Sequence, residues 1–106
     1  MGAHENTSQE LRRGILILAI LSQLEEEQYG YSLIKRLSEF GLEIEQGTLY
    51  PLLRRLESKK LLNSDWRVEG SRPRRYYVIN EDGKELRETL TREWKQMVLV
   101  MEGILT

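Results

Sequence analysis

The sequence predicts a mainly α-helical protein that contains one small β-hairpin. Three segments in the first 60 residues repeat apolar side chains at the three-to-four-residue spacing of a helix. Between residues 63 and 80 the spacing changes to alternation, and the helical spacing returns from residue 81 onward. A chain of 106 residues can form one domain with a modest core, and domains this small often gain stability by associating.

Composition narrows the possible functions. The chain has no cysteine, which excludes disulfides and thiolate metal ligands, and its one histidine is His4 in a polar N-terminal segment. We therefore expect no metal site and no cofactor. The longest apolar run, residues 15–21, is too short to cross a bilayer, and no signal-peptide pattern precedes it. We expect no membrane contact and a cytoplasmic location.

Charge is distributed unevenly along the chain, although the net charge is only −1. Residues 54–75 carry eight Lys and Arg against three Asp and Glu, a net charge of +5. The flanking segments 1–53 and 76–106 carry net charges of −4 and −2. One basic block between acidic ends is typical of a protein that binds a polyanion.

The first helix is expected at about residues 9–24, with Ser8 as its N-cap, after a flexible arm at residues 1–8. Apolar side chains surround this helix almost completely. Such a helix must be buried on more than one side, either at the centre of the core or between two subunits. The second alternative would place Leu11 and Ile15 in a subunit interface.

A second helix opens at the run Tyr29-Gly30-Tyr31-Ser32 and carries apolar residues as far as Phe40. Gly41 then stands where helices often end in the left-handed conformation, which glycine adopts at least cost. Residues 42–45 alternate apolar and acidic side chains, which predicts a short extended link.

The third helix, at residues 46–60, has one apolar face and several polar ones. Leu49, Leu52, Leu53 and Leu56 form the apolar stripe. The other faces carry an amide, two hydroxyl groups and two guanidinium groups, from Gln46, Thr48, Tyr50, Arg54 and Arg55. These groups suit phosphates and base edges in a DNA major groove, although the stretch alone would also suit a solvated basic face. Because Pro51 fits only the first turn of a helix without cost, the regular helix could begin nearer Thr48.

Two strands are expected after this helix, at residues 63–69 and 74–80, because apolar and polar side chains alternate there. The link between them contains Gly70, Ser71 and Pro73, which supply turn chemistry. Arg72, Arg74 and Arg75 surround this link. The pattern predicts a β-hairpin with a strongly basic tip.

The last helix is expected from residue 81, with Asn80 as its N-cap. Its apolar residues follow a nearly heptad seam over about 24 residues, which corresponds to a length of roughly 36 Å. A domain of this size cannot cover such a helix alone, so we expect a second copy to cover it. The expected dimer interface comprises Leu11, Ile15, Leu90, Trp94, Met97, Val98, Met101, Ile104 and Leu105.

The order helix–helix–helix–strand–strand is that of a winged helix-turn-helix, in which the second helix supports the third and the hairpin is the wing. Most of the cations on the third helix and the wing fall inside the basic block. We therefore expect a DNA-binding domain at residues 1–80 and a dimerisation helix at residues 81–106. The alternative is a winged helix that binds protein and not DNA; an enzyme is the weakest hypothesis, because no catalytic cluster or phosphate-binding glycine loop is present.

The chain resembles the PadR family of bacterial transcriptional regulators along nearly its whole length. The resemblance rests on Tyr29-Gly30-Tyr31, on the run Gly47-Thr48-Leu49-Tyr50-Pro51-Leu52-Leu53-Arg54-Arg55-Leu56-Glu57, on Leu61-Leu62 and on Arg74-Arg75-Tyr76-Tyr77. The single long C-terminal helix containing Trp94 is similar to the small subfamily. One departure is Glu45-Gln46, where a better helix cap such as serine would be expected.

Eleven residues are candidates for DNA contact. Those on the third helix and the wing follow from the pattern, and the family resemblance implies backbone contacts from Tyr29, Tyr31 and Lys35. The full set is Tyr29, Tyr31, Lys35, Gln46, Thr48, Tyr50, Arg54, Arg55, Arg72, Arg74 and Arg75. Three alternatives stay open: Arg54 could pair with Glu57 or Ser58, Tyr31 could serve packing alone, and Tyr76 and Tyr77 favour wing packing over base contact.

Trp94 has two interpretations. As structure, it would anchor the dimer seam with its large apolar area. As function, it resembles the tryptophan that multidrug-sensing PadR proteins pair across the dimer around flat aromatic ligands, and Met97 and Met101 would add an adaptable wall. The resemblance thus implies a homodimeric repressor of a near-palindromic DNA operator, released by a planar aromatic small molecule.

Overall fold

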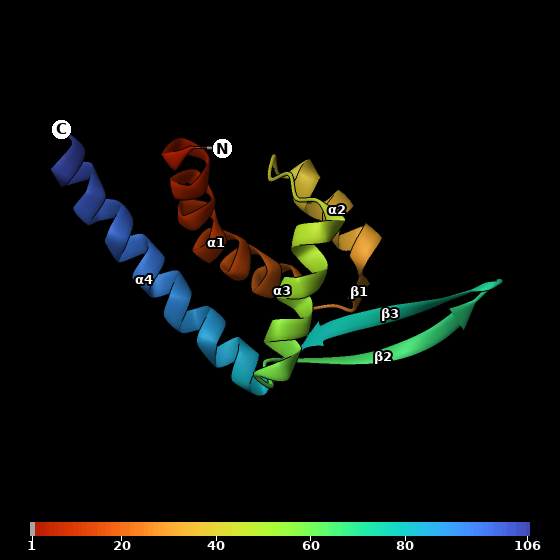
Figure 1. Cartoon of the computed structure of the whole chain (residues 1–106). Helices are drawn as coiled ribbons and strands as arrows, with labels where there is room; N and C mark the ends of the chain where they lie inside the picture. The colour runs from red at the N-terminus through yellow and green to blue at the C-terminus, as the bar shows by residue number, and fades with distance from the viewer. Residues whose placement is uncertain (1) are drawn as a thin grey trace.

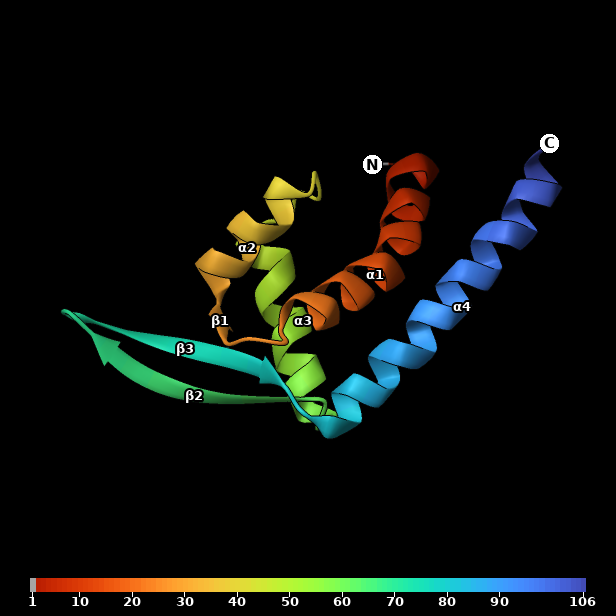
Figure 2. The same cartoon turned by 180° about the vertical axis from the view of Figure 1, so that it is seen from behind.

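The computed structural model describes residues 2–106 and has the predicted fold class: four helices and one small antiparallel sheet (Figure 1). The elements in chain order are α1 (Ala3–Gln23), β1 (Gln28–Tyr29), α2 (Gly30–Glu39), α3 (Gln46–Ser58), β2 (Leu62–Glu69), β3 (Arg72–Ile79) and α4 (Glu81–Leu105). Helices α1, α2 and α3 pack together, the β2–β3 hairpin extends from this body, and α4 leaves it in another direction (Figures 1 and 2). The molecule is therefore elongated, with extents of 54 × 35 × 25 Å.

The start of α1 corrects one prediction. Helix α1 begins at Ala3 with Gly2 as its N-cap, so residues 3–8 are helical, although we assigned residues 1–8 to a flexible arm. Ser8 therefore lies inside the helix and is not its cap; Met1 lies outside the described residues. No proline interrupts this stretch. Glu5 lies in the first turn, where the positive end of the helix dipole stabilises a negative charge.

The sheet contains a strand that the sequence pattern did not reveal. β1 pairs antiparallel with β3, with Gln28 opposite Tyr77 and Tyr29 opposite Tyr76, and β2 pairs with the other edge of β3. A strand of two residues is too short to show an alternating pattern, so the prediction of a two-stranded hairpin was incomplete. Its importance is positional, because β1 fixes the start of α2 against the wing.

The core lies where α1, α2 and α3 meet the base of the hairpin. The predicted leucine stripe of α3 is buried, with at most 7% of any of its four side chains exposed. It packs with residues from every neighbouring element: Leu16, Ile20, Leu21, Leu24, Leu33, Leu37, Ile44, Leu62, Tyr77 and Ile79. Burying this stripe holds α3 by one side and leaves its other faces outward.

Two predicted helix ends are confirmed. Gly41 adopts a φ of +95° directly after α2, in the left-handed region. Asn80 caps α4, since its side-chain oxygen accepts a hydrogen bond of 2.9 Å from the amide of Gly83. Gly83 itself packs very closely on the turn between α3 and β2: a Cβ there would stand 2.2 Å from the carbonyl oxygen of Leu61.

The long C-terminal helix is also confirmed, at 25 residues. Its first turns pack on the core through Leu86 and Leu90, whereas its second half extends away from the rest of the chain (Figure 2). Large apolar side chains are exposed along this half: Trp94, Met97, Leu99, Val100, Met101, Ile104 and Leu105. Within residues 2–106, no helix combines the length and apolar character needed to cross a membrane.

Candidate nucleic-acid interface

A groove of about 410 Å³ lies between the start of α2, the start of α3 and the wing. Six of the eleven predicted DNA-contacting residues line it, together with Pro73. The six are Tyr29, Tyr31, Gln46, Tyr50, Arg72 and Arg74. Residues from three separate parts of the sequence thus form one surface, and it is rich in the hydroxyl, amide and guanidinium groups that bind nucleic acid.

The tyrosines of this groove are held in place by close packing. A Cβ on Gly30 would stand 2.2 Å from the Cε1 atom of Tyr50, so the absence of a side chain at Gly30 lets the Tyr50 ring lie against the start of α2. The rings of Tyr29 and Tyr31 stack with 6.5 Å between their centroids, and Tyr76 meets Tyr29 edge-on at 5.4 Å. Tyr31 is still exposed, so its packing leaves it accessible.

Arginines of the wing cover these rings. The guanidinium carbon of Arg74 lies 4.5 Å from the ring centroid of Tyr29, and that of Arg67 lies 4.6 Å from the centroid of Tyr76. The hydroxyl of Tyr76 donates a hydrogen bond to Glu69, which raises the pKa of Tyr76 because that bond needs the phenolic proton. Tyr76 thus has partners on the wing and on β1, and the preference for packing over base contact stays a prediction.

Arg75 differs from its neighbours, because it joins the wing to α3. Its guanidinium donates hydrogen bonds of 2.8 Å to the Glu57 carboxylate and 3.0 Å to the Ser64 hydroxyl. The Arg75 and Glu57 side chains are only 35% and 26% exposed. The pKa of the neighbouring Tyr77 is raised because its ring is buried. The prediction that Arg75 contacts DNA stays untested, but its guanidinium has protein partners.

Arg54 has the opposite environment. It is exposed on α3 and, within residues 2–106, has no hydrogen-bond or ion-pair partner. The alternative in which Arg54 pairs with Glu57 does not occur, because Glu57 binds Arg75 and Ser64. Lys35 and Arg72 likewise have no partner in the described part of the chain. These three cations are available to an external anion.

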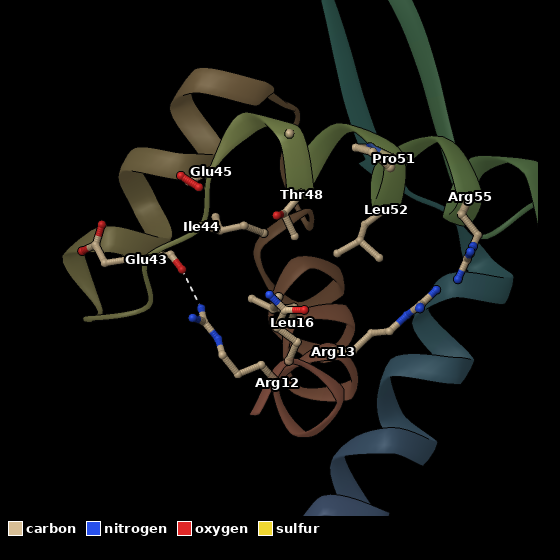
Figure 3. Close-up of a pocket in the computed structure, with 12 residues that line it drawn as sticks. Arg12, Arg13, Leu16, Glu43, Ile44, Glu45, Thr48, Pro51, Leu52 and Arg55 are labelled. Carbon is tan, nitrogen blue, oxygen red and sulfur yellow. Dashed lines mark hydrogen bonds between the residues drawn. The ribbon is translucent and has the colours of Figure 1, made fainter. Parts of the chain in front are cut away.

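Five of the eleven predicted residues do not line the groove, and two of these five lie together at another place on the surface. Thr48 and Arg55 line a second cleft, on the flank of α3 that faces α1 (Figure 3). At 100° per residue, Arg55 stands 140° around the helix from Tyr50, so one helix presents two distinct polar flanks. The helical spacing was a signal that could have separated them.

The acidic turn after α1 is a feature whose role sequence reasoning missed. Glu25 accepts a hydrogen bond of 2.6 Å from Arg87 of α4 and lies 3.8 Å from Lys84, and Glu27 pairs with Arg67 of β2. The hydrogen bond and charge of Arg87 hold the pKa of Glu25 below its ordinary value. This acidic turn therefore contacts both α4 and the wing.

Within residues 2–106, no group of three or more His, Asp or Glu side chains is placed so that it could hold a metal ion. The arrangement is instead a supported helix, a free cationic face beside it and a basic hairpin. A winged helix-turn-helix DNA-binding domain is the class of protein that these features define.

Comparison with known proteins agrees with this class. The PadR-like family of transcriptional regulators matches residues 17–89. Transcriptional regulator Rv3488 of Mycobacterium tuberculosis is 39% identical over 93 residues, which cover 79% of this chain and 86% of that protein. The crystal structure of a PadR family regulator from Eggerthella lenta superposes with a TM-score of 0.87 and 42% identity. The match covers 95% of this chain and 90% of the Eggerthella lenta chain. The structure of a PadR-like transcription factor from Bacteroides fragilis superposes with a TM-score of 0.78 and 34% identity. The match covers 93% of this chain and 98% of that one.

The chain belongs to the PadR-like family of transcriptional regulators. It therefore regulates transcription through a DNA-binding winged helix. The family resemblance that the Gly47–Glu57 run suggested is confirmed.

Proposed function

We propose that this protein is a homodimeric, sequence-specific repressor that acts in the cytoplasm, with residues 1–80 binding DNA and residues 81–106 joining the two subunits. The observation that carries the DNA-binding part is the groove at the start of α3, where Gln46, Tyr50 and Arg74 meet. In a dimer, two α3 helices would enter successive major grooves of a near-palindromic operator, about 34 Å or 10 bp apart. Arg54 would read a guanine or clamp a phosphate, and the wing arginines would meet the neighbouring backbone.

The test is fluorescence anisotropy on the DNA upstream of the protein's own gene, against a shuffled duplex, at two salt concentrations. If about 6–10 phosphates are contacted, the affinity should fall by roughly 10³–10⁵ between about 50 and 200 mM salt. We expect preference for the native duplex and two chains bound per duplex. A steep salt dependence without preference would reject autoregulation, and no binding at low salt would favour the protein-interaction alternative.

Dimerisation through α4 is supported by the apolar half of that helix. Trp94, Met97 and Met101 are 44%, 55% and 44% exposed in the single chain. An exposed apolar surface of this kind is typical of an interaction site. Leu11 of α1 is 73% exposed and would extend the same interface, together with Ile15, Leu90, Val98, Ile104 and Leu105.

An effector would act at this interface. A planar aromatic molecule between two copies of Trp94, beside Met97 and Met101, would change the spacing of the two DNA-reading helices, provided that it binds the DNA-free state more tightly. We expect such a compound, for example a planar dye cation, to quench the emission of Trp94. The Trp94→Phe variant controls for Trp66, and equal quenching in the two proteins would reject the effector site.

A further inference from the structure

A second concave surface lies on the flank of α3 that faces α1. It is separate from the groove between the starts of α2 and α3 and the wing. α1, the residues before α3 and α3 itself enclose a cleft of about 710 Å³ (Figure 3). Small-molecule sites commonly measure about 300–1,000 Å³, so the cleft has the size of a ligand site. It has no residue in common with the set around Trp94.

The floor of the cleft is apolar. Leu16, Ile44 and Leu52 belong to the core, yet they are the core residues on α1, the link and α3 that keep 5–8% of their surface exposed. In Figure 3 the Leu16 and Leu52 side chains point into the space between the two helices. An apolar group placed here would cover the narrow apolar strip that these side chains leave open.

The wall of the cleft carries an unusual arrangement of charge. Arg13 of α1 and Arg55 of α3 extend toward each other across the opening (Figure 3). Neither has a hydrogen-bond or ion-pair partner within residues 2–106. Two guanidinium groups that face each other repel unless an anion lies between them, and a carboxylate can accept parallel hydrogen bonds from such a fork.

The carboxylates that line the cleft do not supply this anion. Glu43 accepts a hydrogen bond of 2.7 Å from the Ser38 hydroxyl, and its backbone carbonyl accepts one of 2.6 Å from Arg12. Glu45 lies at the end of the cleft away from Arg13 and Arg55 (Figure 3). The facing arginines are therefore left for a ligand.

We propose that this cleft binds a small molecule that has a carboxylate head and a short apolar body. The head lies between Arg13 and Arg55, and the body lies on Leu16, Ile44 and Leu52. Binding would occupy Arg55 and the cleft side of Thr48, two residues of the predicted DNA-contacting set, and would thereby weaken DNA binding. This last consequence rests on the proposed function; the binding of the ligand does not.

Isothermal titration calorimetry with octanoate tests the proposal on the full chain without DNA. Acetate has the charge without the body, and 1-octanol has the body without the charge. We expect octanoate to bind at least tenfold more tightly than either. No heat from octanoate at millimolar concentration, or equal affinity for octanoate and 1-octanol, would overturn the proposal.

Variants assign the site. Arg13→Gln and Arg55→Gln should each weaken octanoate binding about tenfold, whereas Lys95→Gln, an exposed cation of α4, should leave it unchanged. All three side chains are exposed, so circular dichroism should show intact folding. Amide shifts on octanoate addition should cluster near Leu16 and Thr48; shifts confined to the surroundings of Trp94 would place the ligand elsewhere and overturn the proposal. DNA affinity measured without octanoate tests the proposed function separately.

Discussion

Replacing Gly83 by alanine should lower the free energy of unfolding by about 2–3 kcal/mol. An alanine in place of a helical glycine usually stabilises a helix by up to about 1 kcal/mol, so the expected sign is reversed here. The reason is that the new Cβ would stand 2.2 Å from the carbonyl oxygen of Leu61 and 2.7 Å from Cγ1 of Ile79. Backbone cannot move aside as a flexible side chain can, so α4 must shift, and overpacking of this kind costs about 1–3 kcal/mol or more.

Urea unfolding followed by circular dichroism measures this effect, and Gly103→Ala is the matched control. Gly103 lies in the same helix, and a Cβ there would meet nothing within 4 Å. We expect Gly103→Ala to leave the midpoint unchanged or raise it slightly. If Gly83→Ala were as stable as Gly103→Ala, the result would contradict the close contact between Gly83 of α4 and the Leu61 backbone.

Much of this fold follows from patterns that lie within one helix or one strand. The four-leucine stripe predicted which side of α3 is buried, and the alternation from Trp66 to Ile79 predicted the wing, because in each case the period is a local property of the backbone. The start of α1 was missed because its first residues carry no such local pattern. Residues 4–8 are polar and show no apolar period, so nothing local distinguished helix from arm.

The site divides in the same way. The sequence could gather the candidate residues, because the third helix and the wing tip are each contiguous. It could not tell free arginines from engaged ones, because the partners of Arg75 lie 11 and 18 residues earlier in the chain. Nor could it show β1 or the contacts of Glu25 with α4, which depend on how distant segments meet in space.

Arg54 and Arg75 therefore provide the sharpest test of the interface. Arg54→Ala should weaken operator binding by about 1–3 kcal/mol, or roughly 5- to 150-fold, since it removes a free guanidinium from the outward face of α3. Its stability should stay within about 0.5 kcal/mol of the parent. Arg75→Ala should show the converse: a stability lower by about 1 kcal/mol, discounted for partial exposure, because the Glu57 carboxylate and Ser64 hydroxyl lose a partner.

Two measurements separate the loss of DNA affinity from the loss of stability. Fluorescence anisotropy on the operator, at a temperature where all variants are folded, gives the first, and urea unfolding gives the second. Lys95→Ala is the control, because it removes a cation outside the basic block. A larger loss of DNA affinity from Arg75→Ala than from Arg54→Ala would mean that Arg75 exchanges Glu57 for a phosphate on binding. In that case the arginine that holds the wing against α3 in the free protein would bind the DNA backbone in the complex. Equal, parental affinity in both variants would reject α3 as the DNA-reading helix, whatever their stabilities.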